Sequence, residues 1–118
     1  MRKRFSAQLY QFVRQGLVGG CVWGLRSDEG DWGVTRSNVE NVLEVMPFWT
    51  NQDDAEKVCC EEWRVYSATA IDLEEFLEDW LPGIHKDCMQ VGINWCSDLR
   101  GDEVAPLDLM EVFVSKLD

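Results

Sequence analysis

Segments with helical periodicity alternate along this chain with short runs of residues that favour β-strands. The segments that predict helices are residues 5–15, 51–62, 73–80 and 106–117. The runs that predict strands are residues 21–25, 32–36, 42–46, 65–70 and 90–95. The predicted order is α-β-β-β-α-β-α-β-α. It indicates an α+β fold in which helices cover a single-layer mixed or antiparallel sheet of about five strands.

Several predicted boundaries depend on single residues. Asp72 is the expected N-cap of the third helix, with Glu75 three positions later as in a capping box, and Pro82-Gly83 is expected to end that helix. Gly16 is expected to end the first helix and Pro47 the third strand. The last helix is predicted to turn the following side chains inward: Leu107, Met110, Phe113, Val114 and Leu117.

Length and composition favour one domain over residues 1–118. A chain of 118 residues buries roughly two thirds of its unfolded surface, which suffices for one core. No apolar run reaches the ~20 residues that span a bilayer, and residues 5–15 read as a helix, not as a signal peptide. The five cysteines are odd in number and scattered, so we expect reduced thiols. Together these features predict a cytoplasmic protein that does not enter membranes.

Charge is distributed unevenly along the chain. The sequence holds 11 basic and 22 acidic residues, for a net charge of -11, yet residues 1–26 contain five basic residues and no acid. The acidic remainder argues against nucleic acid as a partner. The predicted acidic face comprises Asp54, Glu61, Glu62, Glu74, Glu75, Glu78 and Asp79. This face has two interpretations: it keeps the protein soluble, or it binds a protein partner with a basic surface.

Several phrases resemble a family of small bacterial proteins known as domain of unknown function twenty-seven fifty. They are residues 46–49 (MPFW), 71–83 (IDLEEFLEDWLPG), 91–95 (VGINW) and 101–106 (GDEVAP). The resemblance extends from the Trp23-Gly24-Leu25 strand to the last helix. It supports the predicted fold, and it implies no reaction and no catalytic residue.

The chain shows no recognisable catalytic or cofactor-binding pattern. Any mechanism that uses histidine would have to use His85, because the sequence contains one histidine, and an ordinary surface residue is the better interpretation. His85-x-x-Cys88 with Cys59-Cys60 is a weak match to a zinc site, since neighbouring side chains diverge by about 100° on a helix. The glycines do not form a phosphate-binding loop. We therefore predict no catalytic residue, no metal and no cofactor.

Six tryptophans are the remaining unusual feature. Trp23 and Trp80 are expected in the core, whereas Trp32, Trp49 and Trp63 are either core residues or an exposed hot spot or cleft. The leading functional hypothesis is a non-enzymatic, acidic protein-interaction module of accessory, regulatory or inhibitor type. The alternative is a small-ligand-binding domain with a tryptophan-lined cleft, and an enzyme comes third.

Overall fold

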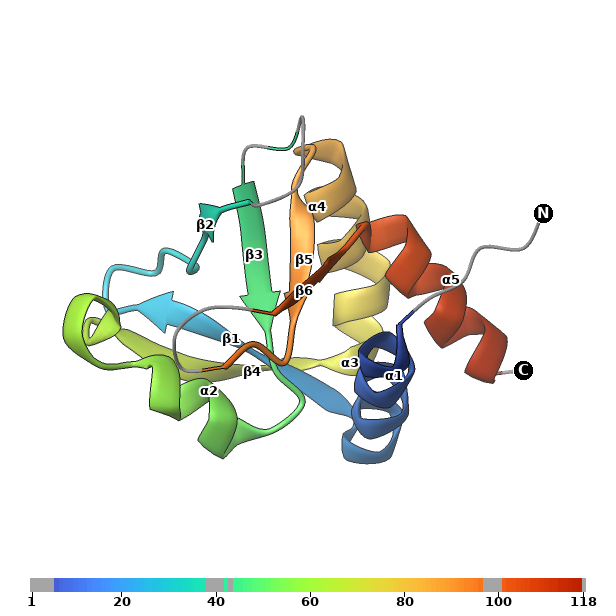
Figure 1. Ribbon diagram of the computed structural model, residues 1–118, viewed down its shortest axis with the longest axis horizontal. Coiled ribbons are helices and arrows are strands. Elements are labelled where there is room, and N and C mark those ends of the chain that lie inside the picture. Colours follow the sequence, from blue (N-terminus) through green and yellow to red (C-terminus); the bar gives the residue numbers. More distant parts are fainter. Residues whose placement is uncertain (1–5, 38–41, 43, 97–100, 118) are drawn as a thin grey trace.

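The computed structural model describes residues 6–37, 42, 44–96 and 101–117, and Figure 1 shows the arrangement of its elements. Within these residues the strands are β1 (Cys21–Ser27), β2 (Thr35–Arg36), β3 (Glu44–Phe48), β4 (Tyr66–Asp72), β5 (Gln90–Ile93) and β6 (Asp102–Val104). The helices are α1 (Ala7–Gly19), α2 (Gln52–Val58), α3 (Leu73–Glu75), α4 (Leu81–Lys86) and α5 (Pro106–Leu117). Two further turns are the 3₁₀ turn η1 (Glu61–Trp63) and the π-helical turn η2 (Phe76–Trp80).

The α+β class is confirmed, but the strands form two sheets where the sequence predicts one. In the described part of the chain, a four-stranded sheet has the order β2-β3-β5-β6, and β1 pairs with β4 in a two-stranded antiparallel sheet. In the larger sheet β3 and β5 run parallel and the other pairs antiparallel. The sheets meet at one bridge, where Trp23 and Trp49 exchange backbone hydrogen bonds of 2.7 and 2.8 Å.

The predicted hairpin between residues 21–25 and 32–36 is largely wrong. The main partner of β1 is β4, which covers it over its full length from Cys21 to Ser27. The turn after Ser27 does close, since Ser27 N–H donates to the Asp31 carbonyl (2.8 Å) and Gly33 N–H to the Leu25 carbonyl (2.7 Å), and these two bonds form an isolated Arg26–Trp32 bridge. The predicted turn at residues 38–41 lies outside the described residues.

Strand β6 was not predicted from the sequence. A run of three residues is too short to show the alternation of apolar and polar side chains that indicates a strand.

The helix that follows β4 continues past Pro82-Gly83, contrary to the prediction. Asp72 caps it as expected, accepting a hydrogen bond from Glu74 N–H (3.2 Å), and helical backbone runs through α3, η2 and α4 to Lys86. In the wide turn η2 the Leu81 N–H donates to the carbonyl of Phe76, five residues back. Pro82 is the second residue of α4 and lies in its first turn, directly after η2, where proline is tolerated because its missing N–H needs no helical partner.

Two other predicted stops are also wrong. Helix α1 continues through Gly16 to Gly19 and ends at Gly20, which has a left-handed φ of 72°. Gly16 is instead a contact point between helices, where an added Cβ would lie 3.2 Å from the ring of Phe113.

Strand β3 continues through Pro47. Strand β2 pairs with β3 at Glu44 and Val45 only, so Pro47 lies beyond the end of that ladder and breaks none of its bonds. On the other edge the pairing with β5 continues, and the Phe48 carbonyl accepts the Asn94 N–H at 2.9 Å.

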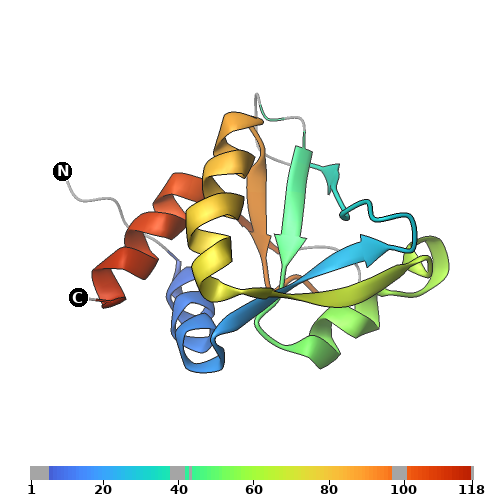
Figure 2. The ribbon, with the colours of Figure 1, turned by 180° about the vertical axis from the view of Figure 1, so that it is seen from behind.

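The main core lies between the larger sheet and the helices α1, α3 to α4, and α5, which gather to the right of the strands in Figure 1 and on the left from behind in Figure 2. Phenylalanine rings connect its parts edge to face: Phe76 lies 4.9 Å from Phe48 and 6.4 Å from Phe113. In α5 the buried residues are Pro106, Leu109, Val112 and Phe113. The predicted inward positions Leu107, Val114 and Leu117 are exposed.

A smaller core lies where α2 packs against β1 and β4. Its buried members are Leu25, Val45, Trp49, Ala55, Val58 and Trp95. Both buried indoles are hydrogen-bonded, with Trp49 Nε1–H donating to the Trp95 carbonyl and Trp95 Nε1–H to the Asp102 carbonyl, each at 2.8 Å. Neither indole is left without a partner, which is the condition for burying a polar nitrogen.

Candidate functional site

A shallow cleft lies between the long helix and the strands β3 and β5. Its volume is about 270 Å³. The lining residues come from η2, α4, β3 and the segment before β5: Met46, Asp79, Trp80, Gly83, Ile84, Asp87 and Met89. The parallel pairing of β3 with β5 and the crossover helix between them bring these distant residues together.

Trp80 forms an aromatic wall of this cleft. It is half-buried, and its ring lies 4.5 Å from that of Trp32 and 6.0 Å from that of Phe48, edge to face in both cases. Trp32 is itself held in place, since the Arg26 guanidinium lies 5.6 Å over its ring and a Cβ at Gly24 would approach it to 3.0 Å. The wall is therefore fixed from behind by packed aromatic rings.

The charges that line the cleft are acidic. Asp79 and Asp87 are exposed, and their separation by eight positions corresponds to about 12 Å along a helix axis. The basic side chains nearest in sequence, His85 and Lys86, are exposed and do not line the cleft. Two methionines and an indole thus line the same cleft as two carboxylates. Such a surface is suited to an aliphatic chain that carries a positive charge.

The predicted acidic residues are exposed, but they do not form one continuous face. They are divided into Asp54, Glu61 and Glu62 before β4, and Glu74, Glu75, Glu78 and Asp79 after it. Strand β4, seven residues or about 20 Å long, lies between the two groups in the chain. Asp79 is the member of the predicted set that lines the cleft.

The predicted tryptophan set is also divided. Trp49 is 0% exposed, so its proposed role in a hot spot or cleft is wrong, and it packs in the smaller core instead. Trp32 and Trp63 are half-buried. Trp63 packs at 4.9 Å against Tyr66, away from the cleft lining. Trp80, which the sequence placed in the core, is half-buried and lines the cleft.

The family model for proteins of unknown function DUF2750 matches residues 9–113. The chain belongs to this family. No curated protein and no solved structure matches the chain.

Other candidate chemistry in this DUF2750 chain is sparse. Within the described ranges, no three His, Cys, Asp or Glu side chains lie close enough together to hold a metal ion, and no helix is long and apolar enough to cross a bilayer. His85 is exposed, and its carbonyl accepts the Cys88 N–H at 3.0 Å. Burial raises the pKa of the Cys59 thiol, with smaller contributions from Glu56 and Cys60, which makes Cys59 a weaker nucleophile than a free thiol.

Proposed function

We propose that this protein is a non-enzymatic interaction module that binds a partner with a basic surface, and that the cleft receives a lysine or arginine side chain of that partner. The observation that carries the proposal is that the apolar side chains of Met46, Met89 and Trp80 line the same cleft as the carboxylates of Asp79 and Asp87. The stem of a long basic side chain is apolar and its head is charged, so each part of the cleft has a counterpart.

The chemistry of the lining favours such a side chain. An indole face attracts a cation by about 0.5–1 kcal/mol at an exposed site, and methionine side chains adapt their shape to an aliphatic stem. Glu78 directly precedes the cleft residue Asp79, Glu75 lies about one turn before it on the same helix, and both are exposed. Their field would draw a basic surface toward the cleft and accelerate association.

Cleft size distinguishes this proposal from the alternative of a small-ligand-binding domain. Pockets for metabolites usually enclose about 300–1,000 Å³ and bury most of the ligand. The cleft of about 270 Å³ lies just below that range and is open, so its open shape more than its volume favours one side chain over a free metabolite.

The test uses peptides of glycine and serine that carry a central lysine, arginine or norleucine, titrated into the labelled protein and followed by NMR. Norleucine has an aliphatic stem without a charge. We expect the lysine and arginine peptides to shift the amide signals of Trp80, Gly83 and Met89. The norleucine peptide should shift them far less, because the carboxylates then have no partner.

Matched charge reversals supply the control. Asp79→Lys with Asp87→Lys should abolish the shifts. Asp54→Lys with Glu62→Lys changes the net charge equally at the far end of β4 and should retain them. Equal losses in both variants would show that only the overall field attracts the peptides. If free 1,5-diaminopentane binds as tightly as the lysine peptide, the small-ligand alternative is favoured.

A further inference from the structure

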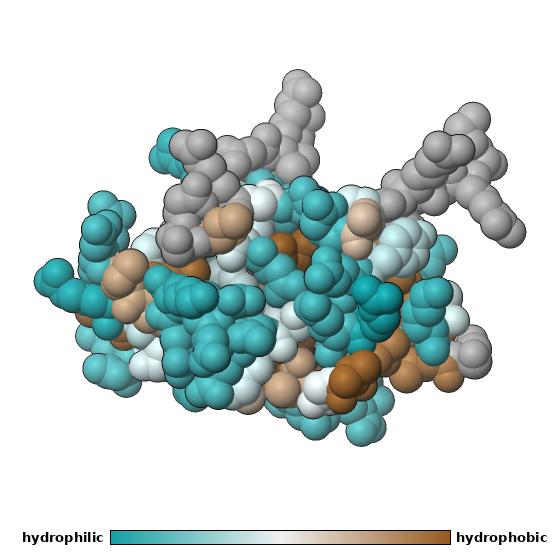
Figure 3. Space-filling view, turned by 60° about the horizontal axis from the view of Figure 1, so that its bottom comes forward, coloured by the Kyte–Doolittle hydropathy of each residue, from teal (hydrophilic) through white to brown (hydrophobic). Residues whose placement is uncertain are grey.

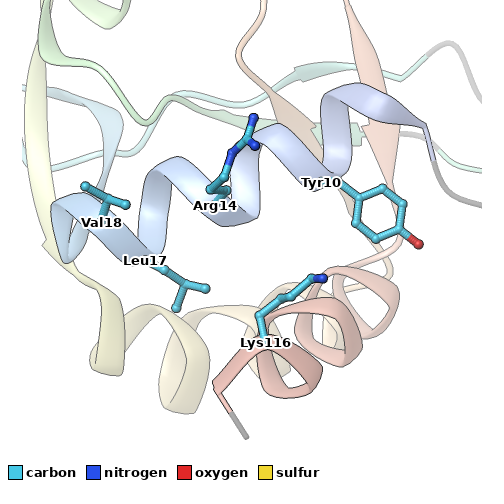
Figure 4. Close-up of a pocket in the computed structure, with 5 residues that line it drawn as sticks. All are labelled: Tyr10, Arg14, Leu17, Val18 and Lys116. Atoms are coloured by element: carbon cyan, nitrogen blue, oxygen red, sulfur yellow. The ribbon is translucent and has the colours of Figure 1, made fainter.

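A second groove lies between α1 and α5, on a part of the molecule that the cleft does not involve. Its volume is about 460 Å³, and its lining comprises Tyr10, Arg14, Leu17, Val18 and Lys116. Figure 4 shows Leu17 pointing from α1 toward the helices below it, Lys116 extending from α5 toward Tyr10, and Arg14 extending from α1 on the side away from α5. No residue of this groove belongs to the acidic face or the tryptophan set discussed above.

Helix α1 carries two apolar stripes, and the core uses one of them. The buried stripe contains Leu9, Phe12, Val13 and Gly16. The second stripe contains Tyr10, Arg14, Leu17 and Val18, which follow the i, i+4, i+7, i+8 spacing of one helical face. Leu17 is partly buried against the main core, whereas Tyr10 and Val18 are exposed. A helix at the surface of a globular protein needs one apolar stripe, so the exposed part of the second stripe is available to a partner.

Exposed apolar side chains concentrate on these two helices. Among the described residues, five of the six exposed large apolar side chains lie there: Tyr10, Val18, Leu107, Val114 and Leu117. Val18 is 86% exposed, and the sixth residue, Val65, lies far away before β4. In the space-filling view of Figure 3, brown surface gathers at the lower right, over α1 and α5. Val18 and Tyr10 therefore add exposed apolar surface at the groove, whereas Leu107 and Val114 lie on the other side of α5 from Lys116.

The charge at this groove is opposite to that of the protein as a whole. Arg14 and Lys116 line it on two sides of the apolar strip, although the net charge of the chain is -11. Helix α1 contains no acidic residue. The acids of α5 are Asp108 and Glu111, and neither of them lines the groove.

We infer that the groove between α1 and α5 docks an acidic amphipathic helix of a partner protein. Two packed helices with an apolar strip between them accept a third helix, whose apolar side chains recur at about one turn. Acidic residues on the flanks of that helix would pair with Arg14 and Lys116. A symmetric contact with a second copy is disfavoured, because it would bring the same two cations of both copies together.

The test compares two synthetic helical peptides with leucine at i, i+3, i+4 and i+7. One carries glutamate on its flanks and the other lysine. Binding of the fluorescein-labelled peptides is measured by anisotropy at about 0.15 M salt, where the Debye length is about 8 Å. We expect the acidic peptide to bind although the protein is strongly acidic, and Val18→Asp to weaken that binding by about tenfold or more. Arg14→Glu should weaken the acidic peptide selectively.

Matched controls lie in one distant exposed turn. Val65→Asp and Arg64→Glu make the same changes away from the groove and should leave binding of the acidic peptide unchanged. The inference is overturned if the acidic peptide does not bind, or if these control variants weaken it as much as the groove variants do. It is also overturned if sedimentation shows a dimer that Val18→Asp dissociates, since a second copy would then cover the groove.

Discussion

The cleft beside Trp80 and the groove between α1 and α5 are both apolar depressions at the edge of a helix, yet their charges are opposite. Asp79 and Asp87 line the first, and Arg14 and Lys116 the second. The difference follows from the sequence, because α1 comes from the first 26 residues, which contain no acid. The charged residues of the cleft therefore have the same sign as the net charge of -11, and those of the groove have the opposite sign.

The cleft and the groove rest on one shared core, and removing a large side chain from that core is expected to have the largest effect on stability. Phe76 is fully buried and touches Phe48 beneath the cleft and Phe113 beneath the groove. We expect Phe76→Ala to lower the free energy of unfolding by about 3–5 kcal/mol, through lost burial and the cavity it leaves. Urea denaturation measures this loss. A loss under about 1 kcal/mol would mean that this helix is not docked on the core as described.

Helix caps allow each surface to be loosened separately. Asp72 caps the helix of the cleft, and the Ser6 hydroxyl caps α1 by accepting the Leu9 N–H at 3.2 Å. Asp72→Ala and Ser6→Ala should each cost about 1 kcal/mol. Hydrogen exchange should report faster opening of α3 in the first variant and of α1 in the second. Faster exchange of both helices in either variant would show that the two surfaces open as one unit.

Reversal of charge near the cleft separates steering from stability. Glu75→Lys with Glu78→Lys should change the free energy of unfolding by only ~0–1 kcal/mol, because both side chains are exposed. The same variant should slow association with a basic peptide and flatten its salt dependence. Stopped-flow rates at two ionic strengths measure both effects. If the association rate and its dependence on salt concentration do not change, these acidic residues take no part in binding and only keep the surface solvated.

The groove variant is expected to have the smallest effect on folding. Val18 is 86% exposed, so Val18→Asp should shift the free energy of unfolding by no more than about 0.5 kcal/mol. Its thermal midpoint should match that of Val65→Asp, the control in the distant turn. A large destabilisation by Val18→Asp alone would mean that the second stripe of α1 is part of the core.

Much of the secondary structure was predictable from local chemistry. Periodicity located α1 and α5, and the carboxylate of Asp72 correctly marked a helix start. Helix ends were less predictable, because Gly16 and Pro82 act through tertiary packing and a widened turn that no single residue encodes. The pairing of β1 with β4 joins segments some forty residues apart, which local patterns do not specify.

The candidate surfaces were predicted only in part. Exposure of the acidic residues followed from helix periodicity, but their separation by β4 requires the topology. Met46 and Met89 reach the cleft through the pairing of β3 with β5, and no sequence signal marks them. The spacing of Tyr10, Arg14, Leu17 and Val18 was visible in the sequence, yet the burial of the Leu9 stripe was needed to show that it faces outward.

The wide turn η2 fixes the rotational phase of everything that follows it. Each helical residue advances the side-chain direction by about 100°, so a version of this helix shorter by one residue within Phe76–Trp80 would turn its later part by that angle. Ile84 would then leave its buried position, and Asp87 would leave the cleft. The extra residue of the turn therefore acts as a phase-setting insertion, and a deletion there should be more damaging than a substitution at any exposed position of the same helix.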